Sequence, residues 1–213
     1  GLHDTFIAHN LFASVPGESR AKTICSGLAS RFDLSGVPGF FRDADRWRLN
    51  VGGWCAGFFV PVRDLAGRVQ ALQIRRDSGA SRYIWLSSKD KPEGATSGAP
   101  IHFAAAHRLR EGSAIITEGA LKSDVIAQYT ESAVIGLAGV NGYNSNFGTA
   151  LKAAGVRIVR IAFDADWQSN PAVSRGLERL GLLLRDAGLK VSRLDWALSE
   201  GKGLDDLLVQ EVA

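Results

Sequence analysis

Three acidic residues of this sequence follow apolar runs, at positions where carboxylates could hold a metal ion. Glu118 comes directly after the run "SAIIT" and before Gly119, and Asp164 and Asp166 come after the run "VRIVRIAF". A strand that stays extended through the second motif would place Asp164 and Asp166 on the same side. Carboxylates that share one edge of a sheet repel one another, and hard oxygen ligands of this type suit Mg²⁺ or Mn²⁺. The pattern predicts a divalent metal site in which Glu118, Asp164 and Asp166 are the metal-binding and catalytic residues.

Residues beside these carboxylates could bind phosphate. Gly119 has no side chain, so a phosphate or a metal-bound water can approach the backbone where the next helix begins. Lysine is a good point-charge ligand for phosphate, and we predict Lys122 and Lys202 as further nucleotide- and phosphate-binding residues. At the start of a last helix, Asp205 and Asp206 are either capping and first-turn acids or outer metal ligands. Of the two, we expect Asp205 to be the capping residue, and it is also the fourth candidate metal ligand.

Each acidic motif also has an ordinary structural explanation. A lone Glu before a helix usually interacts with the helix dipole, and a lone D-x-D sequence is common in loops. The metal interpretation depends on both motifs standing at strand ends of one alternating unit, because ligands bind beyond the carboxyl ends of the strands in open parallel sheets.

Basic residues cluster in the strands expected at residues 57–64, 68–77 and 82–88. Aromatic residues interleave with them, as in proteins that stack single-stranded bases on aromatic rings. Successive residues of a strand point to opposite faces, so Arg75 and Arg76 lie on opposite faces and the basic residues need not form one continuous binding surface. The predicted nucleic-acid-binding residues are Arg63, Arg68, Arg75, Arg76, Arg82 and Tyr83. The histidines lack the spacing of metal ligands and are interpreted as structural or surface residues; they are His3, His9, His102 and His107.

The elements that must position these residues change character near residue 112. Before it, short helices at 4–12 and 18–32 precede the three strands, which favours a small α+β unit with an antiparallel hairpin. After it, apolar runs at 113–117, 132–139, 156–164 and 190–196 alternate with helices at 120–129, 146–155 and 171–188. This alternation predicts an α/β fold with a parallel sheet of about four strands flanked by helices. We therefore expect domains at residues 1–112 and 113–213.

The bulk composition sets the broad class of protein. The chain has 213 residues, 46% of them hydrophobic, which suits a folded core. Residues 1–112 have a net charge of +5 and residues 113–213 a net charge of −2. A basic half beside an acidic half favours a protein that binds a polyanion next to a metal site. Solvated surface charge gives the same pattern. No apolar run reaches the length of a membrane span, so no membrane partner is expected. Cys25 and Cys55 form no zinc motif, and we expect a reducing, cytoplasmic setting.

The order of these motifs resembles a known family. The chain has an apolar run ending in E-G, then a helix, a strand and a helix, and then an apolar run ending in D-x-D. This order is similar to that of the Toprim domain of bacterial primases, topoisomerases and some nucleases. The stretch "GFFVPVRDLAGRVQALQIRRDSGASRYIWLSS" resembles the hairpin and strand that precede Toprim in bacterial replicative primases. "GKGLDDLL", residues 201–208, resembles the ending of Toprim proteins coded on plasmids, phages and integrated elements. Primases typically read "EGYMD" where this chain reads "EGALK", so Lys122 stands where an aspartate is expected.

The resemblance implies a Toprim fold and a magnesium-dependent, primase-like nucleotidyltransferase. Such an enzyme would synthesise short RNA primers from ribonucleoside triphosphates on single-stranded DNA, for replication of a mobile genetic element. A helicase is an expected partner, through regions outside this sequence. Two alternatives stay open: a Toprim nuclease that uses the same carboxylates with water as the nucleophile, and a non-catalytic nucleic-acid-binding module, which the "EGALK" motif favours.

Overall fold

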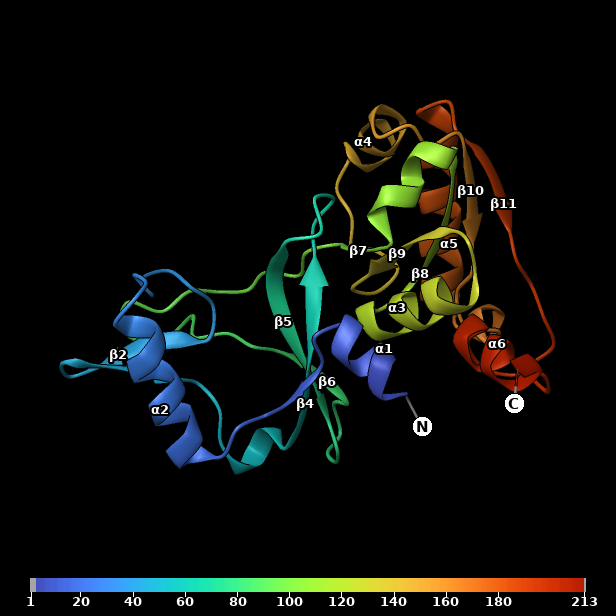
Figure 1. The fold of residues 1–213 in the computed structure, drawn as a ribbon. Helices are drawn as coiled ribbons and strands as arrows, with labels where there is room; N and C mark the ends of the chain where they lie inside the picture. The colour runs from blue at the N-terminus through green and yellow to red at the C-terminus, as the bar shows by residue number, and fades with distance from the viewer. Residues whose placement is uncertain (1–2, 213) are drawn as a thin grey trace. The chain divides into compact units, whose positions relative to one another are not determined.

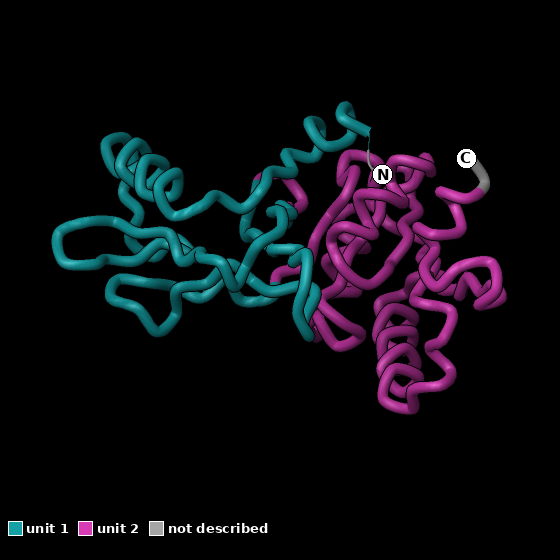
Figure 2. The backbone as a smooth tube through the Cα atoms, turned by 90° about the horizontal axis from the view of Figure 1, so that it is seen from below, with its two compact units in different colours: residues 1–62, 69–99 teal, residues 63–68, 100–213 magenta. Residues whose placement is uncertain are grey.

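The computed structural model describes residues 3–212, with side chains up to residue 210. The chain forms two compact units, which Figure 2 shows in different colours. The first unit comprises Gly1–Val62 and Val69–Ala99, and the second comprises Arg63–Arg68 and Pro100–Ala213. The short turn at residues 63–68 therefore belongs to the second unit, although it connects two strands of the first.

The first unit is built from a four-stranded sheet, a separate two-stranded hairpin and two helices. The four-stranded sheet has the order β1-β4-β5-β6, and β5 and β6 pair in antiparallel fashion. Cys55, Ile74 and Leu86 form the buried centre of this unit's core. The bounds of its elements are α1 Asp4–His9, β1 Ala13–Ser14, α2 Glu18–Ala29, β2 Phe40–Asp43, β3 Arg46–Leu49, η1 Gly53–Cys55, β4 Gly57–Arg63, β5 Val69–Arg76 and β6 Tyr83–Trp85.

The three predicted strands of this unit are present as β4, β5 and β6, but the hairpin of β2 and β3 was not predicted. Its strands pair from Phe40 opposite Leu49 to Asp43 opposite Arg46. The turn between them places Ala44 at a φ of 50°, a conformation usually adopted by glycine or asparagine. Because Ala44 stands where glycine or asparagine is usual, the sequence gives little sign of this hairpin.

The second unit contains a five-stranded sheet with the order β11-β10-β8-β9-β7 (Figure 1). Four strands are parallel, which confirms the predicted parallel sheet, and β7 pairs antiparallel to β9 at its edge. The antiparallel edge strand was not predicted, because it is only three residues long. The bounds of the strands are β7 His102–Ala104, β8 Ser113–Glu118, β9 Ala133–Leu137, β10 Ile158–Ile161 and β11 Lys190–Arg193.

Helices cover both faces of this sheet. On one face, α4 (Phe147–Ala153) and α5 (Pro171–Asp186) pack against Ala114 and Ile116 of β8. On the other, α3 (Ala120–Tyr129) and α6 (Leu204–Val212) pack against Ile115. Successive residues of a strand point to opposite faces, so a strand covered on both sides must be apolar throughout. This is why β8 reads as a continuous apolar run that ends at Glu118. A short 3₁₀ segment, η2 (Ala106–Glu111), precedes β8.

Local signals fix the ends of α5, the longest helix. The Oδ1 atom of Asn170 accepts hydrogen bonds from the backbone N–H groups of Ala172 and Val173, and Pro171 occupies the first helical position. Gly188, with a φ of 83°, follows the helix end. Within the described residues, no helix is both long enough and apolar enough to cross a membrane.

Candidate functional site

The E-G motif forms a tight junction between β8 and α3. Gly119 has a φ of 84°, which disfavours any residue with a side chain. Its N–H donates to the carbonyl of Leu137 at 2.8 Å, and its carbonyl accepts a hydrogen bond from Ser123 Oγ at 2.7 Å. A Cβ atom at Gly136 would lie 2.6 Å from the Gly119 carbonyl oxygen, so β9 approaches this junction closely. Glu118 is therefore held at the carboxyl end of the sheet, where its side chain reaches solvent.

The D-x-D motif lies in a turn beyond its strand. We expected an extended strand through Asp166, but β10 ends at Ile161 and the chain turns at residues 165–166. The Ala165 N–H donates to the carbonyl of Lys202 at 2.8 Å, and the Trp167 N–H donates to the carbonyl of Asp164. These bonds end the strand, begin the 3₁₀ segment η3 (Trp167–Ser169) and tie the motif to the segment that precedes α6.

The capping role at the start of α6 belongs to Asp206 and not, as we expected, to Asp205. The Gly203 N–H donates to Asp206 Oδ2 at 2.9 Å, so Asp206 is the capping residue and the expectation for Asp205 is wrong. Burial raises the pKa of the Asp205 carboxyl, while the positive charge of Lys122 opposes this change. The Oδ1 atom of Asp205 is buried and has no hydrogen-bond partner among residues 3–210. Asp205 thus lies among the candidate site residues, and its Oδ1 atom can still accept a hydrogen bond or bind a cation.

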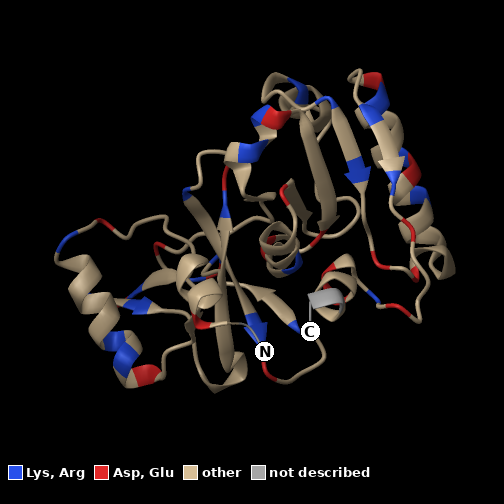
Figure 3. Cartoon of the chain, turned by 45° about the vertical axis from the view of Figure 1, so that its right-hand side comes forward, with Lys and Arg blue, Asp and Glu red and all other residues tan. Residues whose placement is uncertain are grey.

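Two lysines supply positive charge among these carboxylates. The Lys122 ammonium donates a short hydrogen bond to Asp164 Oδ1. The Lys202 ammonium lies 3.6 Å from Asp164 Oδ2 and 3.1 Å from Asp166 Oδ2. Figure 3 shows both acidic and basic residues on the loop that leads into α6, the segment that contains Lys202. The structure therefore brings Glu118, both aspartates and both lysines to one end of the sheet.

The pKa values of the charged groups follow from this crowding. Burial, and then the negative charge of Asp164, raise the pKa of Glu118 above its ordinary value. Burial alone would lower the pKa of Lys122, but its hydrogen bond to Asp164 and that residue's charge outweigh burial and raise it. The hydrogen bond to Asp166 is the main cause of the raised pKa of Lys202. Both lysines stay charged at neutral pH, and Glu118 accepts a proton more readily than a glutamate in water.

The arrangement does not fit a bound metal ion. Across residues 3–210, no group of three or more Asp, Glu, His or Cys side chains is placed to hold one. The donor chemistry is suitable, because all four candidate ligands offer hard carboxylate oxygens. However, ammonium groups lie against both oxygens of Asp164 and one oxygen of Asp166. In this arrangement the lysines stand where the predicted cation would have to bind.

A buried polar network in the same unit was missed by the sequence reasoning. His102 and Asp124 are 1% and 4% exposed, and His102 Nε2 lies 3.1 Å from Asp124 Oδ1. The backbone N–H of Arg63 donates to His102 Nδ1 at 3.0 Å, so Nδ1 is the acceptor and Nε2 donates to Asp124. Arg63 NH1 also lies 3.6 Å from Asp124 Oδ1, and the arginine side chain is 14% exposed. Arg63, a predicted nucleic-acid ligand, is thus largely buried beside a carboxylate.

The other predicted nucleic-acid ligands are divided between the two units. Arg68 lies in the second unit, is 80% exposed at its side chain and pairs with Asp64 at 2.8 Å. In the first unit, Arg75 and Tyr83 are opposite one another on β5 and β6. The guanidinium groups of two of these arginines donate to nearby carbonyls, Arg75 to Arg76 and Arg76 to Ser81. Arg82 and Tyr83 are exposed.

A second basic surface, between α2 and the hairpin of β2 and β3, was also missed. The Arg42 guanidinium lies 5.0 Å from the centre of the Trp47 ring, and the Lys91 ammonium lies 4.6 Å from the centre of the Phe41 ring. Arg42 and Trp47 line a cavity of about 430 Å³. Its other lining residues are Lys22, Cys25, Ser26, Ala29, Asp45, Arg46 and Arg48. The alternation of arginine and aromatic residues at 46–48 is the sequence signal that could have indicated this surface.

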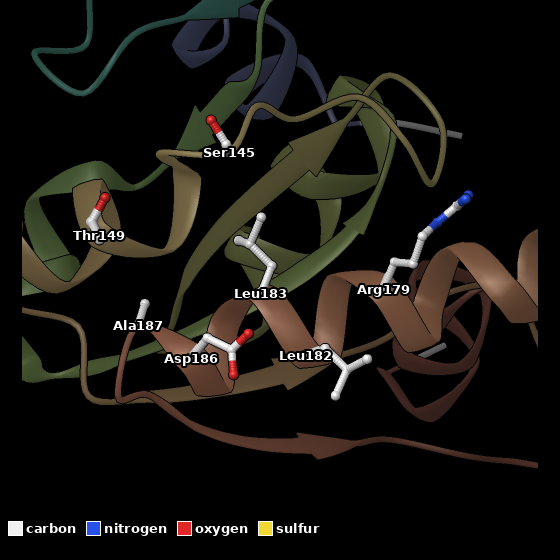
Figure 4. Close-up of a pocket in the computed structure, with 7 residues that line it drawn as sticks. All are labelled: Ser145, Thr149, Arg179, Leu182, Leu183, Asp186 and Ala187. Carbon is white, nitrogen blue, oxygen red and sulfur yellow. The ribbon is translucent and has the colours of Figure 1, made fainter.

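A cavity of about 480 Å³ lies between α4 and α5 and contains none of the predicted site residues. Figure 4 shows its lining, with Leu182 and Leu183 on α5 and Ser145 and Thr149 near the start of α4. Its composition gives no indication of a ligand.

Comparisons with known proteins agree with this fold. The family described as a domain of unknown function (DUF3854) matches residues 109–213. No curated protein matches the chain. Among solved structures, the chain is similar to the zinc-binding and RNA polymerase domains of the Aquifex aeolicus primase, at 18% identity and a TM-score of 0.72. That alignment covers 99% of this chain and 50% of the primase structure, so the chain spans half the length of that relative.

Two further structures show the same likeness. The DnaG primase catalytic domain bound to single-stranded DNA aligns at 18% identity with a TM-score of 0.69, covering 99% of this chain and 64% of that one. The RNA polymerase domain of Mycobacterium tuberculosis primase DnaG aligns at 12% identity with a TM-score of 0.69, covering 99% and 69%. The fold of this chain is therefore that of DnaG primase catalytic cores, with a Toprim-type sheet in its second unit.

Proposed function

We propose that the chain is a primase-like nucleotidyltransferase core that joins ribonucleotides on a single-stranded DNA template. One observation carries the proposal: Glu118, Asp164, Asp166 and two lysines meet at the carboxyl end of a Toprim-type sheet. In open parallel sheets this edge is where ligands bind. The match of nearly the whole chain to primase catalytic cores supports the same activity.

Each residue has a proposed role that follows from its surroundings. Glu118, with its raised pKa, accepts the proton of the attacking ribose hydroxyl. Lys122 and Lys202 bind phosphate oxygens of the incoming nucleotide, since their ammonium groups lie among the candidate site residues. The open backbone at Gly119 lets a phosphate approach the start of α3. Asp164 and Asp166 hold these lysines in position and, with Asp205, are the oxygen donors for Mg²⁺ or Mn²⁺ if a divalent ion enters.

The proposed template contacts are basic and aromatic residues, which are considered separately for each unit. We propose Arg68, Arg82 and Tyr83 as the contacts nearest solvent, because their side chains are exposed. Arg75 and Arg76 are proposed as supporting contacts, and Arg63 as a residue that positions the turn at 63–68. Residues 1–112 are the proposed basic subdomain and residues 113–213 the proposed Toprim domain. The sequence resemblance adds three proposals: replication of a mobile element, a cytoplasmic setting and a partner helicase.

A primer-synthesis assay tests the proposal. Single-stranded DNA, labelled ribonucleoside triphosphates and Mg²⁺ are incubated with the wild-type chain, with Asp164→Ala and with Asp186→Ala as the matched control. Asp186 is an exposed aspartate at the end of α5. We expect oligoribonucleotides from the wild type and the control, and none from Asp164→Ala. Cut template without new product would identify a nuclease instead.

A binding module without catalysis is the second candidate, and one observation favours it. Lys122 stands where related primases have an aspartate, and its ammonium is held by Asp164. A chain of this kind would retain single-stranded DNA in a binding assay but would neither extend nor cut it. Equal DNA binding by the wild type and Asp164→Ala, with no product from either, would support this candidate.

A further inference from the structure

The cavity between α2 and the hairpin of β2 and β3, called here the α2–hairpin cavity, has mostly positive side chains in its lining. Lys22 of α2 and three arginines of the hairpin contribute to it, namely Arg42, Arg46 and Arg48. Among the described lining residues, Asp45 is the one carboxylate. All of these residues belong to the first unit. Four cations against one carboxylate give the cavity a positive potential, which attracts anions.

Three of the four cations form ion pairs with carboxylates that do not line the cavity. The pairs are Lys22 with Glu18 at 2.7 Å, Arg48 with Asp43 at 3.1 Å and Arg42 with Glu93 at 3.5 Å. Every side chain in these pairs is at least 31% exposed. Ion pairs at exposed positions contribute little to stability, so phosphate oxygens can replace the carboxylates at small cost.

Arg46 is the fourth cation, and its charge is not used within the fold. Its side chain is exposed, and within residues 3–210 its guanidinium forms no ion pair or hydrogen bond. Arg46 is directly opposite Asp43 in the hairpin, but the Asp43 carboxylate pairs with Arg48 instead. An arginine in this state is available to a phosphate, which matches the fork of its N–H groups.

The same cavity contains a planar platform. Arg42 and Trp47 are opposite one another on β2 and β3, and the Arg42 guanidinium lies 5.0 Å from the centre of the Trp47 ring. Both residues line the cavity, and Trp47 is only partly buried. Unpaired bases stack on aromatic rings and on guanidinium planes. A duplex keeps its bases stacked on one another, so this platform suits an unpaired strand.

We propose that the α2–hairpin cavity is a second binding surface for single-stranded nucleic acid. Trp47 and Arg42 stack an unpaired base, and Lys22, Arg46 and Arg48 bind the phosphates on either side of it. Because the cations come from α2, β2 and β3 and three of them have separate carboxylate partners, their charge is spread as successive phosphates are. The inference goes beyond the proposed function, since this surface includes none of the residues proposed there as template contacts.

A matched pair of arginine variants tests the phosphate contacts. Fluorescence anisotropy measures how a labelled oligothymidine of about 12 nucleotides binds to the wild type, Arg46→Ala and Arg20→Ala. Arg20 is an exposed arginine of α2 that does not line the cavity. We expect Arg46→Ala to weaken binding about tenfold and to reduce the slope of log affinity against log salt by about 0.7. Equal losses from Arg46→Ala and Arg20→Ala would overturn the proposal, because only the net charge would matter.

Two variants of the tryptophan test the stacking contact. Trp47→Leu removes the ring and should weaken oligothymidine binding about tenfold, whereas Trp47→Phe keeps a ring and should bind within about threefold of the wild type. Base stacking on Trp47 should also quench tryptophan fluorescence in the wild type, and Trp47→Phe should lose that quenching while it still binds. Wild-type affinity in Trp47→Leu, or quenching of unchanged size in Trp47→Phe, would refute the stacking role. Circular dichroism checks that each variant is folded, and Arg46→Ala, which removes no contact of the fold, provides the test if Trp47→Leu is not.

Competitors identify the class of ligand. Thymidine monophosphate, a duplex of the same length and a polyglutamate peptide should each displace the labelled strand only at concentrations far above that of unlabelled oligothymidine. Equal potency of any one of them would overturn the proposal, in favour of a nucleotide pocket, a duplex site or a surface for acidic proteins, respectively. Oligouridine compared with oligothymidine shows whether the natural strand is RNA or DNA, and a strand of either kind that Arg46→Ala binds more weakly supports the proposal.

These outcomes are independent of the primer-synthesis assay. If primer synthesis fails while the Arg46 and Trp47 variants lose affinity as expected, the binding surface stands and the proposed function is wrong. If primers form while these variants bind oligothymidine like the wild type, the proposed function stands and the surface is wrong.

Discussion

The buried pair of His102 and Asp124 should be one of the most sensitive points of the second unit. Their side chains are 1% and 3% exposed, and replacing His102 by leucine keeps the volume but removes the donor to Asp124 Oδ1. Leaving a buried carboxylate oxygen without its hydrogen-bond donor costs about 3 kcal/mol or more. Arg63 remains 3.6 Å from the same oxygen and offsets part of this loss. We expect His102→Leu to lower the free energy of unfolding by about 3 kcal/mol.

A double-mutant cycle separates this interaction from simple packing. His102→Leu, Asp124→Leu and the double variant are unfolded in urea at neutral pH, and unfolding is followed by circular dichroism. Because the double variant no longer holds a buried carboxylate that lacks the histidine donor, it should lose about 2 kcal/mol less than the sum of the single variants. His107→Leu, at an exposed histidine of the same unit, is the control and should change stability by less than about 0.5 kcal/mol. Losses that add within about 0.5 kcal/mol would refute the reasoning.

Three other predictions follow from single residues. Because the pKa of Glu118 is raised in the folded chain, its ionisation opposes folding as the pH rises above the ordinary glutamate value of 4.5. Thermal melting should therefore show that Glu118→Gln gains stability relative to the wild type between about pH 4 and about pH 7. A stability difference that does not change with pH would contradict this. Gly136→Ala places a Cβ atom 2.6 Å from the Gly119 carbonyl oxygen and should cost about 1–3 kcal/mol in urea unfolding, whereas wild-type stability would mean that β9 can move away. Asn170→Ala removes the cap of α5 and should cost about 1 kcal/mol, while Asn170→Asp, which keeps an acceptor oxygen, should cost less.

The sequence determined the elements whose signals are local. The helix at 120–129 was predicted with its observed bounds. The helix predicted at 171–188 begins at Pro171 as expected and ends at Asp186, two residues before its predicted end, because caps and periodicity act within a few residues. The parallel sheet was predictable as well, because strands that helices cover on both faces must be apolar along their length. The E-G and D-x-D motifs indicated at which end of that sheet the candidate site lies.

Only the tertiary structure decided the partners of the site residues. Lys122 and Asp164 are 42 residues apart, and His102 and Asp124 are 22 residues apart, so no local pattern joins them. The strand before Asp164 ends early because Ala165 bonds to the distant carbonyl of Lys202. Hydrogen bonds and charge interactions between residues so far apart in the sequence form only when their helices and strands pack together. That packing is a property of the whole fold and cannot be seen in a local stretch of sequence. The sequence therefore placed the carboxylates at one edge, and the packing of α3 and α6 placed a lysine among them.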